Sequence, residues 1–260
     1  MVHADYAIIG GTGVYDPALL NNPHEEQIET AYGVAHCTIG EYKGKQIAFM
    51  PRHGKAHHVP PHQVNYKANI QALVDSGVKQ ILATAAVGSM RQTLPPGALV
   101  IVDQFLDFTK NRPLTFFEDG EPVTHTDMTD PYCGRLRHHL SQTAERLGIH
   151  AAPGGTYVCT EGPRFESPAE IRMFAQLGGD VVGMTSIPET VLAKERGLCY
   201  ATVAMVTNYC AGMSGAPLTH QEVLDEMAQN VHLMRKLFFE AIATLETGIS
   251  CTCQSSAGNM

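Results

Sequence analysis

Two loops of this chain carry side chains that could hold and cleave a small molecule. They span residues 160–167 and 183–189, and each follows an apolar, strand-like run. Between them they present an aromatic ring, a carboxylate, a thioether and a hydroxyl, on Phe165, Glu166, Met184 and Thr185. Because α/β proteins place their chemistry on loops that follow strands, we expect these residues to form the floor of a binding site.

A cationic segment follows another apolar run, at residues 46–50. Arg52 carries a planar, permanently charged set of N–H donors that suits phosphate or carboxylate, and His53 stands beside it. The segment and its continuation also contain several histidines, namely His53, His57, His58 and His62. No Cys, Asp or Glu lies among them, and Arg52 and Lys55 would repel a cation. We therefore expect an anion site here and no metal.

Two more strand ends can offer backbone N–H groups to an anion. Residues 10–13 form a glycine-rich turn that includes the Thr12 hydroxyl, and residues 87–91 follow the apolar run at 78–86. The first turn lacks the lysine of a P-loop and the full spacing of a dinucleotide fingerprint. An ordinary strand-end turn therefore remains the alternative reading of residues 10–13.

Strands and helices alternate along the chain, which predicts how these loops are positioned. Apolar runs predict strands at 6–9, 46–50, 78–86, 99–102, 155–160, 180–183 and 199–206. Helical spacing predicts helices at 62–76, 132–147, 168–177, 188–197 and 219–245. We therefore predict an α/β fold: a single domain with a central mixed, largely parallel β-sheet flanked by helices.

The last predicted helix opens with a capping box, Thr219 to Glu222. Its apolar stripe, which we expect to be core, comprises Val223, Met227, Val231, Met234, Phe238, Ile242 and Leu245. We assign residues 1–247 to the domain and predict a flexible C-terminal tail at 248–260, rich in Ser, Cys and Gly. Residues 110–130, which include His125, form a long polar segment that we expect to be functional or to cross a subunit interface.

The composition indicates which classes of partner the protein can bind and in which cellular compartment it works. The 260 residues carry a net charge of −8 and a pI near 5.9, which argues against nucleic-acid or membrane-surface binding, since both require a basic face. The sequence shows no signal peptide and no apolar run of spanning length, so we expect a cytoplasmic protein. Most of the seven cysteines are expected to be reduced core thiols. Cys251 and Cys253 are too close for an ordinary structural disulfide, and a redox or metal pair is the alternative left open.

Several motifs, taken together, resemble the trimeric purine nucleoside phosphorylase and methylthioadenosine phosphorylase family. They are Gly10-Gly11-Thr12-Gly13, Arg52-His53-Gly54, Asn65-Tyr66-x-Ala68-Asn69, Glu161-Gly162-Pro163-Arg164-Phe165 and Met184-Thr185-x-x-Pro188-Glu189. The resemblance implies a nucleoside phosphorylase fold, a homotrimer and a pentosyltransferase reaction. In that reaction inorganic phosphate, a co-substrate, attacks C1′ of a purine nucleoside and releases the free base and ribose 1-phosphate. No metal or organic cofactor is implied.

The resemblance also implies roles for individual residues. Those matching the family's phosphate site are Thr12, Arg52, His53, Ala86 and Thr185, while Met184 would lie beneath the ribose and Phe165 against the base. These donors suit a reaction in which the sugar becomes an oxocarbenium-like cation and the purine an anion. Adenine-preferring members often have Thr where this chain has Ala85. One phosphate contact is therefore either absent or made by backbone.

The positions that select the purine base in the family match Glu166 and Asn208. A carboxylate at Glu166 can accept the N1 proton of hypoxanthine or guanine, whereas adenine presents a bare lone pair there, and such a mismatch costs about 1–3 kcal/mol. Asn208 can donate its amide to N7 or O6. Adenine-specific relatives have Ser and Asp at these positions. We therefore predict a 6-oxopurine nucleoside phosphorylase acting on inosine and guanosine.

The group at the 5′ carbon is less strongly specified. His220 matches the position where members that prefer a 5′-hydroxyl have His, whereas methylthio-preferring members have an apolar residue there. His125 instead resembles the methylthioadenosine branch, in which the matching His reaches a neighbouring subunit's 5′ pocket. The alternative activities are therefore phosphorolysis of S-methyl-5′-thioinosine or S-methyl-5′-thioadenosine.

Two other functions fit part of the pattern. A nucleoside hydrolase would use water as nucleophile and would not need the anion donors around Arg52. A purine-binding protein could keep Phe165, Glu166 and Asn208 but would not need the phosphate residues. Dependence of base release on added phosphate separates both from a phosphorylase.

Overall fold

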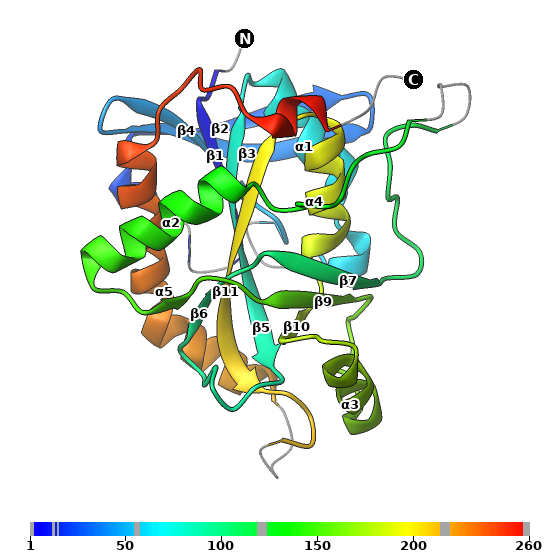
Figure 1. Cartoon of the computed structure of the whole chain (residues 1–260). Helices are drawn as coiled ribbons and strands as arrows, with labels where there is room; N and C mark the ends of the chain where they lie inside the picture. The colour runs from blue at the N-terminus through cyan, green and yellow to red at the C-terminus, as the bar shows by residue number, and fades with distance from the viewer. Residues whose placement is uncertain are drawn as a thin grey trace.

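The computed structural model describes residues 3–11, 14, 16–54, 58–118, 124–213 and 219–256, and for Pro17, His220 and Glu222 the backbone alone. The strands form one mixed sheet flanked by helices (Figure 1). The strands are β1 Tyr6–Gly10, β2 Asn21–Thr30, β3 Gly33–Tyr42, β4 Lys45–Pro51, β5 Gln80–Ser89, β6 Leu99–Ile101, β7 Gln104–Phe108, β8 Ala151–Ala152, β9 Thr156–Thr160, β10 Val181–Gly183 and β11 Cys199–Tyr209. The helices are α1 Tyr66–Asp75, α2 Gly134–Leu147, α3 Pro168–Gln176, α4 Ser186–Glu195 and α5 His220–Thr244, with short 3₁₀ turns at Pro17–Leu19, Pro61–Gln63 and Thr252–Ser255.

The order of strands explains where a site can form. The main path runs β2-β3-β4-β1-β5-β10-β9-β7, and β11 pairs with β5 and β6, of which β6 also pairs with β8. β1 is parallel to β4 and β5, and β5 is parallel to β11. The carboxyl ends of these four strands therefore meet at one edge of the sheet, where ligands bind in open α/β folds.

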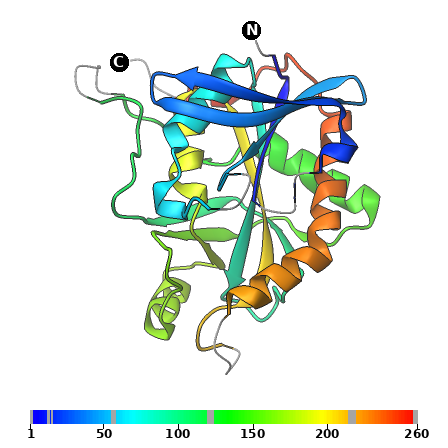
Figure 2. The same cartoon turned by 180° about the vertical axis from the view of Figure 1, so that it is seen from behind.

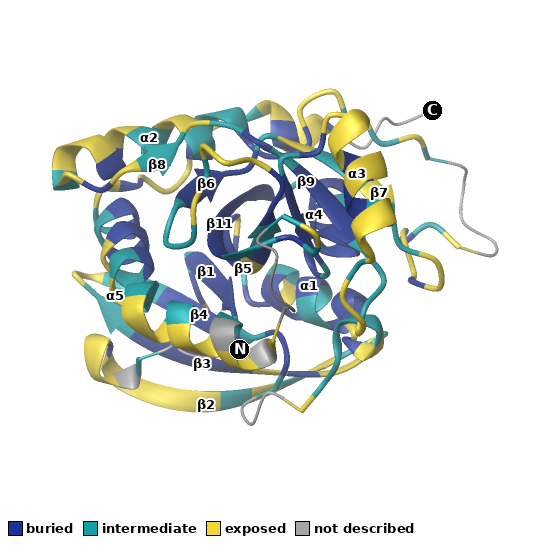
Figure 3. Ribbon diagram, turned by 90° about the horizontal axis from the view of Figure 1, so that it is seen from below, coloured by how far each residue is buried: buried dark blue, intermediate teal, exposed yellow. Residues whose placement is uncertain are grey.

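The core lies on both faces of the sheet. Side chains of β1 alternate between the two faces, so Ala7 and Ile9 join one buried cluster while Tyr6 and Ile8 join the other. α1 and α4 pack together over the first cluster, and α2 and α5 over the second. Figure 3 shows the buried strands enclosed between these helices and the exposed strand β2. The predicted α/β class and mixed, largely parallel sheet are confirmed.

An antiparallel hairpin was not predicted from the sequence. β2 pairs with β3, and β3 pairs with β4. Figure 2 shows these strands across one end of the sheet. Residues of β2 are mostly exposed and include several acidic side chains, so the strand lacks the apolar run on which the sequence prediction depended.

The described part of the C-terminal segment differs from the predicted flexible tail. Thr252–Ser255 form a 3₁₀ turn, and Cys253 is only 3% exposed. The Ser256 hydroxyl donates to the Lys194 carbonyl oxygen over 2.8 Å, while its own carbonyl accepts from the Asp127 amide. The segment from Cys251 to Ser256 therefore packs against the domain, with Cys253 and Ser256 buried.

The polar segment at residues 110–130 has no helix in its described part and only an isolated bridge residue, Thr126. Among the described residues, no helix combines the length and the apolar character needed to cross a membrane.

Candidate active site

A cavity of about 500 Å³ opens where the carboxyl ends of β4, β5 and β11 meet the loops after β9 and β10. It brings together most of the residues that the sequence singled out. Its walls include Arg52, His53, Ala86, Phe165, Glu166, Met184, Thr185 and Asn208. Ala85, the position that departs from adenine-preferring members, also lines it.

Three predicted site residues are not placed in the cavity by the described structure. Thr12 lies outside the described residues, although its neighbour Gly11 lines the cavity. His220 begins α5, but its side chain is not described. His125 is described and does not line the cavity, so within a single chain it takes no part in this site.

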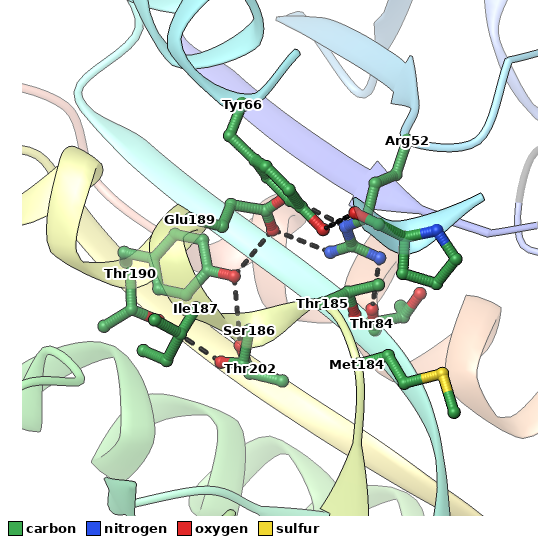
Figure 4. A network of polar contacts seen from close by, with 12 residues as sticks. Arg52, Tyr66, Thr84, Met184, Thr185, Ser186, Ile187, Glu189, Thr190 and Thr202 are labelled. Atoms are coloured by element: carbon green, nitrogen blue, oxygen red, sulfur yellow. Dashed lines mark hydrogen bonds and ion pairs between the residues drawn. The ribbon is translucent and has the colours of Figure 1, made fainter. Parts of the chain in front are cut away.

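The Arg52 guanidinium is buried and already paired. Its Nε and Nη2 donate to the two carboxylate oxygens of Glu189, over 2.8 and 2.7 Å, and its Nη1 donates to the Thr84 carbonyl oxygen over 2.9 Å (Figure 4). Glu189 is fully buried and also accepts from the Tyr200 hydroxyl. A guanidinium has five N–H groups, so two of them have no hydrogen bond to a described residue. The charge of Arg52 is offset by Glu189, and the site offers directed donors rather than an unpaired cation.

The other described residues that were predicted to bind phosphate lie on or after strands and at the start of a helix. His53 donates from Nδ1 to the Val59 carbonyl oxygen over 2.8 Å, since a carbonyl can only accept. Its Nε2 is therefore an acceptor in the neutral ring and a donor only when the ring is protonated. Ala86 is the exposed residue of β5 and has only its backbone to offer. Thr185 precedes α4 and makes no side-chain capping bond, so its hydroxyl is not used by the helix.

Glu166 and Asn208 reach the cavity from different parts of the fold. Glu166 lies on the loop between β9 and α3 and accepts a 2.6 Å hydrogen bond from the Thr160 hydroxyl. Burial raises the pKa of its carboxyl above the ordinary value, and the Thr160 hydrogen bond only partly opposes this. Asn208 follows a β-bulge in β11, accepts from the Thr207 hydroxyl and donates one amide hydrogen to the Tyr209 carbonyl oxygen. Its second amide hydrogen has no hydrogen bond to a described residue.

A glycine sets the position of Met184. Gly162 has φ of +66°, and a Cβ built on it would lie 2.5 Å from the Met184 sulfur. Only glycine therefore allows the loop after β9 to pack against the Met184 side chain, which lines the cavity beside Phe165. Phe165 is 40% exposed, so its ring is available to a ligand at the mouth of the cavity.

Arg112 was missed by the sequence analysis and holds the site together. Its buried guanidinium donates to four backbone carbonyl oxygens: those of Thr160, the last residue of β9, and of Glu161, and those of Met184, after β10, and of Ile187, at the start of α4. It also contacts the Tyr66 hydroxyl over 3.3 Å. Its only sign in the sequence is an arginine before a proline in the polar segment at 110–130. We expected that segment as a whole to be functional or to cross a subunit interface, without singling out Arg112.

The apolar stripe of α5 divides between core and cavity. Met234, Phe238, Ile242 and Leu245 are buried core residues, as predicted. Val223, Met227 and Val231, also predicted to be core, are only partly buried and line the cavity together with Leu224. Met227 and Val231 also pack against the core cluster, so for this part of the stripe the prediction was incomplete rather than wrong. Helical spacing identifies an apolar face without showing that the face also lines a cavity.

Comparisons with known proteins agree on one family. Residues 5–243 match the family model described as Phosphorylase superfamily. The chain is 58% identical over 255 residues to a probable 6-oxopurine nucleoside phosphorylase of Moorella thermoacetica, which covers 98% of each chain. It is 50% identical over 257 residues to the 6-oxopurine nucleoside phosphorylase of Pyrococcus furiosus, covering 96% of each. A crystal structure of a methylthioadenosine phosphorylase from an antarctic soil metagenomic library superimposes with a TM-score of 0.92 at 35% identity, covering 99% of this chain and 92% of that one.

Proposed function

The chain belongs to the Phosphorylase superfamily, and we propose that within it this protein is a 6-oxopurine nucleoside phosphorylase. The observation that carries the proposal is that Glu166 and Asn208 line the same cavity as Arg52 and Thr185. One pair suits a 6-oxopurine base, and the other suits phosphate. A cavity of about 500 Å³ is large enough for both substrates together.

Phosphate is the nucleophile in the proposed reaction. The remaining N–H groups of Arg52, the hydroxyl of Thr185 and the backbone of Ala86 hold it, together with the N-terminal end of α4. A phosphate oxygen forms the new bond to C1′ as the bond from C1′ to the purine N9 breaks, and the electron pair of that bond leaves with the base. The bound phosphate stabilises the cationic sugar, while groups at the base stabilise the leaving purine.

The base is selected by hydrogen-bond direction. The Glu166 carboxylate accepts from N1–H of hypoxanthine or guanine, and the second amide hydrogen of Asn208 donates to N7 or O6 as negative charge develops there. Adenine has no hydrogen at N1, so its lone pair would face the carboxylate. Phe165 stacks on the base, and Met184 lies beneath the ribose.

A methylthio nucleoside is the second candidate substrate, and one observation favours it. Val223, Leu224 and Met227 form an apolar wall on α5, which suits a 5′-methylthio group better than a hydroxyl. S-methyl-5′-thioinosine would keep the Glu166 contact and use this wall. His220, at the start of the same helix, favours the 5′-hydroxyl, so inosine and guanosine remain the first choice.

The deciding experiment measures base release from inosine, guanosine, S-methyl-5′-thioinosine and S-methyl-5′-thioadenosine, each with and without phosphate. We expect inosine and guanosine to be cleaved only with phosphate, and S-methyl-5′-thioadenosine to be cleaved poorly. Release without phosphate would indicate a hydrolase. If S-methyl-5′-thioadenosine is the best substrate, the base assignment of Glu166 and Asn208 is wrong.

The remaining proposals concern assembly and conditions. We propose that the enzyme is a homotrimer in the cytoplasm and that the reaction needs no organic cofactor or metal. The cysteines in the described structure are all free thiols, which suits a reducing compartment. Light scattering and cell fractionation test the first two proposals, and activity after exhaustive chelation tests the third.

A further inference from the structure

Four cysteine sulfurs gather at a point away from the cavity. They belong to Cys133, Cys199, Cys251 and Cys253, and all of them lie within 4.8 Å of one another. Among the described residues this is the one group of His, Cys, Asp or Glu side chains with spacing suited to a metal ion. None of the four lines the cavity.

The cluster joins three distant parts of the chain. Cys133 is the residue before α2, Cys199 begins β11, and Cys251 and Cys253 flank one residue at the C-terminal 3₁₀ turn. Cys133, Cys199 and Cys253 are buried and Cys251 is partly exposed, so a small ion could enter from one side. The sequence alone showed only the pair at 251 and 253.

The spacing of the sulfurs fits a tetrahedral thiolate site. With a zinc–sulfur bond of about 2.3 Å, the sulfurs of a tetrahedron lie about 3.8 Å apart. The sulfurs of Cys133 and Cys251 are 3.7 Å apart. One central ion requires all four sulfurs to lie close together, as they do here, and all four cysteines are free thiols in the structure.

One guanidinium and one helix N-terminus lie beside the cysteine cluster. The Arg135 Nη2 lies 3.7 Å from the Cys199 sulfur and also donates to the Gln80 side chain over 2.7 Å. The Arg135 Nε is buried and has no hydrogen-bond partner among the described residues. The N-terminal end of α2 adds its partial positive charge beside Cys133. These groups would balance the net negative charge of four thiolates around one divalent cation.

We propose that Cys133, Cys199, Cys251 and Cys253 bind one thiophilic divalent cation, Zn²⁺, in a structural site that fastens the C-terminal segment to α2 and β11. Four thiols lose their protons as the ion binds, and no electrons are transferred. With four protein ligands the coordination shell is closed, so the ion holds the fold and takes no part in phosphorolysis.

The test uses the full chain, purified under reducing conditions, and its Cys253→Ser variant. Cys37→Ser is the matched control, because Cys37 is also a buried free thiol but lies on β3, outside the cluster. We expect one zinc per chain by elemental analysis in the wild type and the control, and at least about tenfold weaker zinc binding in Cys253→Ser. Chelation should lower the Tm of the wild type and the control, but not that of Cys253→Ser.

Two further measurements keep the proposal testable if the variant folds poorly. Titration of the reduced wild type with Co²⁺ should give the visible absorption of a tetrahedral thiolate complex, at one ion per chain. Mass spectrometry of the unreduced protein should find the four cysteines as thiols. The proposal is overturned if the reduced wild type takes up no zinc or cobalt, if Cys253→Ser binds as tightly as the wild type, or if the cysteines are paired as disulfides that bind no metal after reduction.

Discussion

At the scale of single residues, the site depends on polar groups that are held in place by neighbours rather than on isolated charges. Arg52 illustrates this most clearly, because Glu189 and Thr84 use three of its donors before any ligand arrives. Glu166 is similar, since one of its carboxylate oxygens is held by a hydrogen bond from the Thr160 hydroxyl. Specificity then follows from the direction of the donors and acceptors that remain.

Glu166→Gln should lower kcat/KM for inosine by about 10- to 100-fold, because the amide presents a donor or a weaker acceptor to N1–H. The loss for an adenine nucleoside should be smaller, since Gln can donate to the bare N1. Steady-state kinetics on both substrates measure the difference. Glu145→Gln, on the exposed face of α2, serves as the control. Equal losses for both bases would contradict the role of Glu166.

The raised pKa of Glu166 predicts two pH effects of opposite direction. Activity on inosine needs the carboxylate, so kcat/KM should fall as pH drops through a value above the ordinary 4.5, and Glu166→Gln should lack this acid limb. For stability, the folded state binds the proton more tightly than the unfolded state. The ionised carboxyl therefore destabilises the fold at neutral pH, and this cost disappears as pH falls below 4.5. Glu166→Gln should have the higher Tm at pH 7, with the difference lost in acid. A lower Tm at pH 7 would be inconsistent with burial as the cause of the shift.

Glu189→Gln should destabilise the protein by about 3–5 kcal/mol, because it leaves the buried charge of Arg52 without its partner. Denaturant unfolding measures this loss. The double variant Arg52→Met with Glu189→Met should recover part of the stability, yet should lose phosphate-dependent activity. If the double variant stays active, Arg52 does not bind phosphate.

At the scale of elements, strand ends place the candidate site residues, and a side chain from a loop connects the segments that carry them. The parallel strands β4, β5 and β11 end at the cavity, and α4 starts there. Arg112 then joins the end of β9 to the loop after β10 and the start of α4, through four backbone carbonyl oxygens. Arg112 is therefore a positioning residue.

Arg112→Lys should lower kcat/KM by about tenfold or more, because one ammonium group cannot reach both loops as the planar guanidinium does. Hydrogen exchange should rise at residues 160–166 and 184–187, which a loss of general stability would not confine to those loops. Arg172→Lys, on the exposed face of α3, is the control. Unchanged exchange in both loops would show that Arg112 does not align them.

At the scale of the whole molecule, the C-terminal segment packs against elements that lie far from it in the sequence. Ser256 bonds to Lys194 and Asp127, and Cys253 is buried in the core cluster beneath α2 and α5. The folded part of the chain therefore extends beyond residue 247, the boundary expected from the sequence.

A chain ending at residue 250 should be less stable than one ending at residue 256 by about 1–3 kcal/mol, since it loses this burial and these hydrogen bonds. Both should be compared by denaturant unfolding in the presence of a chelator, so that metal binding does not contribute. The catalytic residues are untouched, so kcat/KM at moderate temperature should be retained. Equal stability of the two chains would mean that residues 251–256 do not support the fold.

The layer architecture and most of the candidate site could be predicted from the amino-acid sequence. Apolar runs and helical spacing identify buried strands and amphipathic helices because burial imposes those periods, and residues such as Phe165, Glu166 and Thr185 follow strands whose ends must meet. The exposed hairpin strand β2 was not predictable in this way because it lacks an apolar pattern. Four features could be seen only in the folded chain. They are the ion pair of Arg52 with Glu189, the contacts of Arg112, the division of the α5 apolar stripe between core and cavity, and the cluster of four cysteines. These features depend on contacts between segments that are distant in the sequence. A local sequence pattern does not show which side chains from such segments come into contact.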